Sequence, residues 1–192
     1  GEKLTPTTTF VKISCFIFVA RSDALFIRNT LPALCKMAAK AECNTVVVLD
    51  TSKPNGVLGE RLQQSELSEV IEILEDINRT YSFVIDISSP TQSEVRGLSS
   101  IHMGRSYSET HCFRGYPMHG SIRQFHECNS DYILHLDSDM LFHEAKGVSW
   151  VESGIDLMEE NEDILCVLPR GGPPSNEGVL HQGTTYYKKD DA

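Results

Sequence analysis

Short apolar runs, separated by segments with helical periodicity, are the feature that most constrains this chain. The runs are rich in β-branched residues and have the length of strands that are buried on both faces. They span residues 11–19, 44–50, 81–87, 131–137 and 163–169. Strands that alternate with helices form βαβ units, and such units build a mainly parallel sheet with helices on both faces. The sequence therefore predicts a three-layer α/β fold.

The helices between these runs are predicted from apolar residues three or four positions apart. Ser22 is expected to cap the first helix, and Pro32 is expected to kink it. The apolar stripe of that helix contains Ile27, Leu31, Leu34 and Ala38. Further helices are predicted around residues 67–77, 122–128 and 148–158. Residues 88–116 are predicted to be a long polar connection, and the sequence RGGPPSNEG at 170–178 is predicted to be a break.

Composition excludes some classes of function. The chain has 192 residues, which suits one domain, and its 17 basic residues against 27 acidic ones give a net charge of -10. A protein that binds nucleic acid through phosphates needs a basic surface, so nucleic acid is not an expected partner. No apolar run reaches the length of a transmembrane segment, and residues 10–20 are predicted to be a strand rather than a signal peptide.

The cysteines bear on the cellular compartment. There are six, none in a Cys-x-x-Cys pair, and most lie within apolar segments. Free thiols in a reducing compartment are therefore expected, which favours a cytoplasmic location. The sequon Asn78-Arg79-Thr80 leaves open a lumenal location, as does membrane association of a longer protein.

Acidic residues end two of the predicted strands. Asp50 ends the second, and Asp137 ends the strand DYILHLD, with Asp139 two residues later. Parallel strands end at one edge of a sheet, and ligands of such sheets bind outside that edge. Two carboxylates so placed can share Mg²⁺ or Mn²⁺, an ion that neutralises a departing diphosphate. The alternative is that Asp137 to Asp139 form only a turn, and that Asp50 begins a turn with Ser52.

The order of these elements, and the tract HECNSDYILHLDSDMLF at 126–142, resemble the nucleotide-binding half of GT-A-fold glycosyltransferases, particularly those with the family 2 pattern. The resemblance covers about residues 11–168. It implies a Rossmann-like GT-A fold in one domain, 1–192. Residues 11–140 would form the nucleotide-sugar-binding half, and 141–192 a short acceptor-side part. It also implies metal-dependent transfer of a sugar from a UDP- or GDP-type donor to a hydroxyl acceptor.

The resemblance also implies roles for the acidic residues. Asp137 would face the ribose or the metal-bound nucleotide, and Asp139 would be the main ligand of the metal that holds the diphosphate. Ser138 would keep the turn between them tight and contribute to the nucleotide site. Asp50 would lie beside the base or ribose.

The same resemblance places the base pocket at the end of the first strand. Val19, Ala20 and Arg21 would line it, although many relatives carry a Tyr-Asn pair or an acid where Arg21 stands. Arg123 could reach a phosphate, as could Arg105 and Arg114, and the helix N-terminus expected at 117–120 would also favour an anion. His111 and His119 are left out of the expected metal site.

The tail after Asp139 is short and lacks the Gln-x-x-Arg-Trp pattern of processive relatives. Within it, His181 could supply a third metal ligand and Glu177 could act as general base on the acceptor hydroxyl. The acceptor half is therefore expected to be abbreviated, or the chain to be the front portion of a larger protein.

Two other functions fit parts of the sequence. The first is a noncatalytic or partner-dependent module that binds a nucleotide sugar. The second is a phosphatase of the haloacid dehalogenase type, whose nucleophile lies in an Asp-x-Asp motif. That motif normally opens the domain and is followed by a hydroxyl residue, whereas Met140 and Leu141 follow here. Sugar nucleotidyltransferases are disfavoured because VARSDA replaces their glycine-rich loop.

Overall fold

A computed structural model describes residues 11–53, 55, 59, 65–144 and 146–169, together with the backbone of 184–188. The chain divides into two compact units, residues 1–142 and 143–192. The larger unit contains a four-stranded sheet, and the smaller one a helix and a two-stranded sheet.

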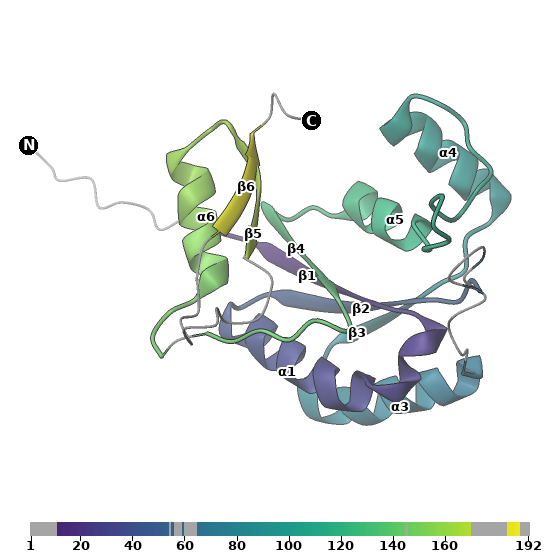
Figure 1. Ribbon diagram of the computed structural model, residues 1–192, viewed down its shortest axis with the longest axis horizontal. Helices are drawn as coiled ribbons and strands as arrows, with labels where there is room; N and C mark the ends of the chain where they lie inside the picture. The colour runs from purple at the N-terminus through teal and green to yellow at the C-terminus, as the bar shows by residue number, and fades with distance from the viewer. Residues whose placement is uncertain are drawn as a thin grey trace, which may run out of the picture. The chain divides into compact units, whose positions relative to one another are not determined.

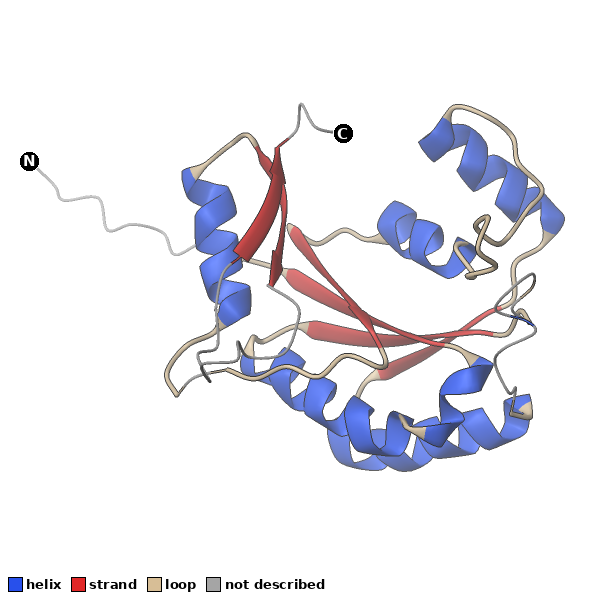
Figure 2. Cartoon of the chain, viewed as in Figure 1, coloured by secondary structure: helices blue, strands red, loops and turns tan. Residues whose placement is uncertain are grey.

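The four-stranded sheet is parallel throughout (Figure 2). Its strands are β1 (Ile13–Val19), β2 (Asn44–Asp50), β3 (Val84–Ser88) and β4 (Tyr132–Asp137), in the order β3-β2-β1-β4. The chain therefore builds outward from β1 to β3 and then returns to place β4 on the other side of β1. This reversal is the arrangement of doubly wound α/β sheets.

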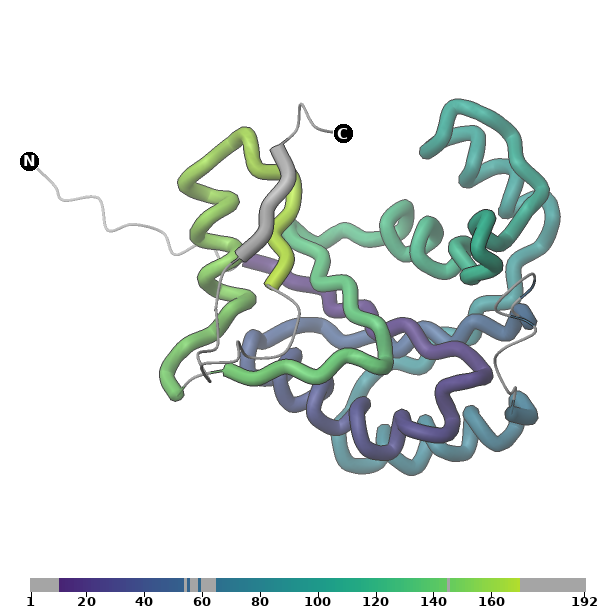
Figure 3. The backbone as a smooth tube through the Cα atoms, viewed as in Figure 1, coloured from purple at the N-terminus to yellow at the C-terminus, as the bar shows by residue number. Residues whose placement is uncertain are grey.

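Helices cover both faces of this sheet, as Figure 1 shows. On one side lie α1 (Ile27–Lys40) and α3 (Leu67–Tyr81), which follow β1 and β2. On the other side lie α4 (Gln92–Met103) and α5 (His119–Glu127), which the chain traverses between β3 and β4 (Figure 3). The predicted α/β class, with a parallel sheet flanked by helices, is confirmed, and the arrangement is compatible with a Rossmann-like fold.

The two faces of the sheet differ in chemistry because side chains alternate along each strand. The apolar face packs against α1 and α3 and carries Cys15, Ile17, Val19, Val47, Leu49, Leu134 and Leu136, each no more than 8% exposed. The polar face lies under α5 and carries Asp50, Asp86, Ser88, His135 and Asp137. Burial of the apolar face accounts for most of the core of this unit.

The first crossover differs from its prediction at its start. A 3-10 helix, η1 (Arg21–Leu25), precedes α1, and Phe26 rather than Ser22 is the N-cap of α1. The prediction for Ser22 is therefore wrong. The predicted apolar stripe is confirmed, since Ile27, Leu31, Leu34 and Ala38 are all buried, and Pro32 lies inside the helix.

The predicted polar connection at 88–116 is wrong because α4 occupies part of it. A capping box begins this helix: the Glu94 amide donates to Thr91 Oγ1 at 3.3 Å, and the Thr91 amide donates to Glu94 Oε2 at 2.7 Å. Gly104, with φ of 65°, ends it. Only Val95 and Ser99 are buried along α4, so its apolar periodicity is weak. The sequence Thr91-Gln92-Ser93-Glu94 was the signal that could have located it.

The third strand also begins later than predicted. Tyr81 is the last residue of α3, and Ser82 follows it in the left-handed conformation, with φ of 49°. The strand β3 then begins at Val84.

The smaller unit contains α6 (Trp150–Glu160), β5 (Ile164–Pro169) and β6 (Thr184–Lys188). The fifth predicted strand is present, but it pairs antiparallel with β6 in a separate sheet instead of extending the parallel one. Gly154 of α6 faces Val167 of β5, where an added Cβ would lie 3.6 Å from a Val167 methyl group. The predicted break at 170–178 lies outside the described residues.

All six cysteines are free thiols, as predicted. Cys15 and Cys35 are buried, and burial raises the pKa of the Cys35 thiol to about 12. In the described part of the chain, no helix combines the length and apolar character needed to cross a bilayer.

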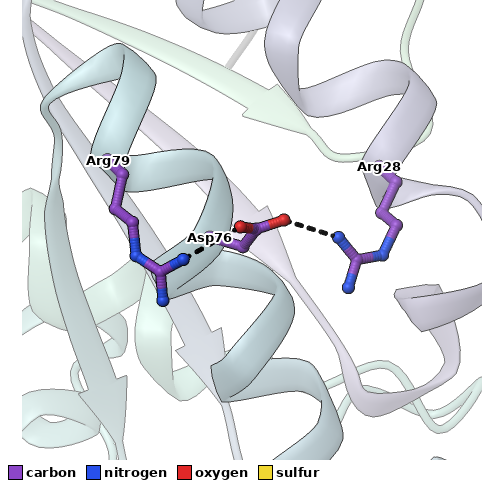
Figure 4. A network of polar contacts seen from close by, with 3 residues as sticks. All are labelled: Arg28, Asp76 and Arg79. Carbon is purple, nitrogen blue, oxygen red and sulfur yellow. Dashed lines mark hydrogen bonds and ion pairs between the residues drawn. The ribbon is translucent and has the colours of Figure 1, made fainter.

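An exposed ionic network joins the two helices on the apolar face (Figure 4). The carboxylate of Asp76 in α3 accepts from Arg28 of α1 at 2.9 Å and from Arg79, one turn later in α3, at 3.1 Å. All three side chains are at least half exposed, so water and salt screen their attraction. The network therefore contributes little to stability.

Two substitutions in α3 should separate apolar burial from ion pairing. Leu74 is fully buried, so Leu74→Ala should lower the free energy of unfolding by about 2–5 kcal/mol through lost packing and a cavity. Asp76→Asn should lower it by less than about 1 kcal/mol. Urea unfolding followed by circular dichroism measures both. A larger loss in Asp76→Asn than in Leu74→Ala would contradict the assignment of stability to the apolar face.

Candidate functional site

The carboxyl ends of the parallel strands bring polar residues to one edge of the sheet. Phe18 pairs with both Val48 and Asp137, and Asp50 pairs with Ser88. The strand order reverses between β1 and β4, and open α/β sheets bind ligands in the crevice at such a reversal. The end of β4, at Asp137 to Asp139, therefore lies beside the end of β1 where a ligand is expected.

Asp23 fixes the turn after β4 to the end of β1. The Ser138 amide donates to Phe18 O at 3.0 Å, and its hydroxyl donates to Asp23 Oδ2 at 2.6 Å. The same carboxylate oxygen accepts from the Ala20 amide at 2.8 Å. Ser138 is only 2% exposed. Its buried hydroxyl therefore holds the turn in place. Asp23 was not predicted from the sequence, where its position three residues after Ala20 was the available signal.

The carboxylates on either side of Ser138 face solvent. Asp137 has a 61% exposed side chain, and its Oδ1 lies 3.8 Å from His135 Nε2. Asp139 is exposed and makes no hydrogen bond or ion pair with the described part of the chain. Both carboxylates are accordingly free to bind a cation or a ligand.

A metal at this turn would draw on few protein ligands. Among the described residues, no group of three or more His, Cys, Asp or Glu side chains is arranged to hold an ion. Mg²⁺ in nucleotide sites is commonly held by one or two carboxylates, with water and phosphate oxygens completing its shell. Asp137 and Asp139 fit that requirement. The predicted third ligand His181 and the predicted base Glu177 lie outside the described residues.

Asp50 is buried, at 8% exposure. It was predicted either to begin a turn with Ser52 or to lie beside the base or ribose of a nucleotide. The Ser52 amide donates to its Oδ1 at 2.8 Å, and the Ser52 hydroxyl bonds the same atom, as expected of a turn. Its other oxygen faces the start of α5, where a Cβ on Gly120 would lie 3.7 Å from it. That Cβ would also lie 3.3 Å from a Val48 methyl group. Glycine therefore lets the helix N-terminus approach the ends of β2 and β3.

Buried polar atoms accumulate beside this approach. His119 is 3% exposed and Ser88 is fully buried. Within the described structure, the two ring nitrogens of His119 and the hydroxyl of Ser88 all lack a hydrogen-bond partner. Burial lowers the pKa of His119, and the nearby positive charge of Arg123 lowers it further. His119 is therefore held as a neutral imidazole. Sequence reasoning set it aside because a single histidine gives no pattern.

His119 also lines a cavity of about 170 Å³ between α4, residues 104–118 and α5. Val95, Tyr107 and Ile122 form part of its wall, together with His111, whose Nε2 is buried without a partner. The Nδ1 atom of His111 bonds Thr110 Oγ1 at 2.8 Å. His119 therefore borders both the cavity and the ends of the strands.

Two of the predicted ligand-binding arginines, Arg21 and Arg123, have structural partners. Arg21 donates from Nε to Ser65 O at 2.9 Å, which ties η1 to the segment before α3. Arg123 forms an ion pair with Asp86 of β3, and Gln124 donates to the same carboxylate. Each guanidinium is mostly buried in these contacts, so a role in ligand binding for either residue stays a prediction.

Comparisons of the chain with protein-family models, curated proteins and solved structures returned no match.

His119 should make stability depend on pH. Because its pKa is lowered in the folded protein, the unfolded chain binds more protons below about pH 6.5, and stability falls as the pH falls. His119→Leu removes this proton linkage and two unpaired nitrogens. Denaturation measures the free energy of unfolding at pH 7.5 and at pH 5.5. Between these two values, His119→Leu should lose less of it than the wild type, whereas the exposed-site control His143→Gln should lose as much as the wild type. Equal losses in the wild type and His119→Leu would refute the proton linkage assigned to His119.

Proposed function

We propose that this protein transfers a sugar from a nucleoside-diphosphate sugar to a hydroxyl acceptor and depends on a divalent metal for the transfer. The observation that carries the proposal is the pair of solvent-facing carboxylates, Asp137 and Asp139, on either side of the buried Ser138. They lie at the carboxyl end of β4, beside β1, where the strand order reverses.

Electrostatics favours a cation between this turn and a diphosphate. Two carboxylates on a chain of net charge -10 would repel the phosphates of a donor. Mn²⁺ or Mg²⁺ prefers oxygen ligands, so Asp139, with Asp137 beside it, would hold the ion while donor oxygens complete its shell. The ion would supply charge neutralisation to the diphosphate as it leaves.

The nucleoside would lie toward β1 and β2. Asp50, at the end of β2, is the residue expected beside the base or ribose, and its carboxylate can accept hydrogen bonds. Val19 and Ala20 close the end of β1, and Asp23 already uses the Ala20 amide. The donor would be of the UDP or GDP type, and the acceptor a hydroxyl group. Glu177 as general base and His181 as third ligand remain predictions.

The position of the Asp137–Asp139 motif in the fold weighs against the phosphatase alternative. In that mechanism Asp137 attacks phosphorus and Asp139 acts as acid and base. The motif follows β4, an outer strand of the described four-stranded sheet, instead of opening the domain. The other alternative is a noncatalytic binding module. It would be identified if the wild type binds the donor but neither transfers nor hydrolyses its sugar.

Asp139→Asn should abolish metal-dependent donor binding without loss of fold. With Mn²⁺ and a matching UDP- or GDP-type sugar at about five times its dissociation constant, the wild type should gain about 2–4 °C in Tm. The variant should gain nothing. Its Tm without ligand should stay close to that of the wild type, because substitutions at exposed positions change stability by about 0.5 kcal/mol or less.

Asp163→Asn, at another exposed aspartate, is the matched control and should behave as the wild type. Radiolabelled sugar release from the donor, measured in the same samples, separates transfer or hydrolysis from binding. Equal stabilisation of the wild type and Asp139→Asn would remove the metal role assigned to Asp139.

A further inference from the structure

Two histidines meet between α4 and α5, away from the acidic turn. His102 lies in the last turn of α4 and His126 in the last turn of α5. His102 Nε2 and His126 Nδ1 are 3.1 Å apart, and the two rings are nearly perpendicular, at 83°. Both side chains are exposed, so a solute ion can reach them.

The spacing of these nitrogens matches one edge of a metal coordination shell. Ligand nitrogens about 2.0–2.1 Å from Zn²⁺ are roughly 2.9 Å apart at a right angle and roughly 3.3 Å apart at the tetrahedral angle. The observed 3.1 Å falls between these values. We propose that His102 and His126 form a chelating site for a borderline transition-metal ion such as Zn²⁺, with water in the remaining positions.

The ligand type separates this site from the one at Asp137 and Asp139. Imidazole suits Zn²⁺, Cu²⁺ and Ni²⁺, whereas carboxylate and water suit Mg²⁺ and Mn²⁺. In the absence of metal, the facing nitrogens share one proton in an N–H···N hydrogen bond. When an ion binds, that proton moves to the other nitrogen of its ring through solvent, which leaves a lone pair on each facing nitrogen for the ion.

An ion at this position would connect the two helices that frame the cavity. Residues 104–118 link α4 to α5, and several of them line the cavity together with His119, at the start of α5. A bond between the ends of α4 and α5 would limit the separation of these helices. The metal would thus stabilise the layer that covers the polar face of the sheet.

Calorimetric titration with ZnCl₂ tests the site in the full chain. An Asp139→Asn background removes the carboxylate site from the titration. In that background, His102→Gln and His126→Gln should each weaken Zn²⁺ binding at least about tenfold, because loss of even a supporting partner of a ligand typically costs 10–100-fold. The double variant should bind at least as weakly as either single variant, since it also removes the one imidazole that each single variant keeps.

His143→Gln is the control for loss of an exposed imidazole and should leave the affinity unchanged. Circular dichroism of each variant confirms folding, and Cu²⁺ electron paramagnetic resonance should show coupling to two nitrogens in the control and fewer in His102→Gln. Unchanged Zn²⁺ affinity in both His102→Gln and His126→Gln would overturn the proposal. With Asp139 intact, both variants should keep any Mn²⁺-dependent nucleotide binding, so this site and the proposed function can fail separately.

Discussion

Parallel pairing of β1 with both β2 and β4 is the constraint on which the rest of the structure depends. Because the four strands of this sheet run in one direction, their carboxyl ends share an edge, and residues distant in sequence such as Ala20, Asp50 and Asp137 gather there. Pairing on both sides of β1 also requires the chain to cross back over the sheet. The return passage places α4 and α5 opposite α1 and α3.

The difference between the two faces explains why the polar residues of the candidate site lie on one of them. The face against α1 and α3 is wholly apolar at its buried positions and carries the stability of the larger unit. The face under α5 accepts Asp86, Ser88 and Asp50, whose burial costs free energy unless they are hydrogen-bonded. Asp86 is satisfied by Arg123 and Gln124, whereas the Ser88 hydroxyl is not. Unmet polar capacity of this kind is common at sites that receive a ligand.

Sequence reasoning succeeded where burial dictates pattern. The bounds of β2 were predicted to the residue, and β1, β4 and the core of α3 were located because apolar residues there follow the period of each element. It failed at α4, which buries only two residues and depends on its capping box. It also missed that β5 pairs with β6, since an apolar run does not reveal which strand is its partner. Asp23 and the pair of His102 with His126 were missed because their contacts cross between elements.

The contacts of Asp23 have a consequence for how tightly a ligand could be held. One carboxylate oxygen links the amide that follows β1 to the hydroxyl that follows β4, so the two strand ends keep a fixed spacing before any ligand arrives. A flexible turn would lose backbone freedom on binding, at roughly 1–2 kcal/mol for each residue ordered. Here that entropic cost is met during folding. Asp23, which need never touch a ligand, would thereby raise affinity through preorganisation.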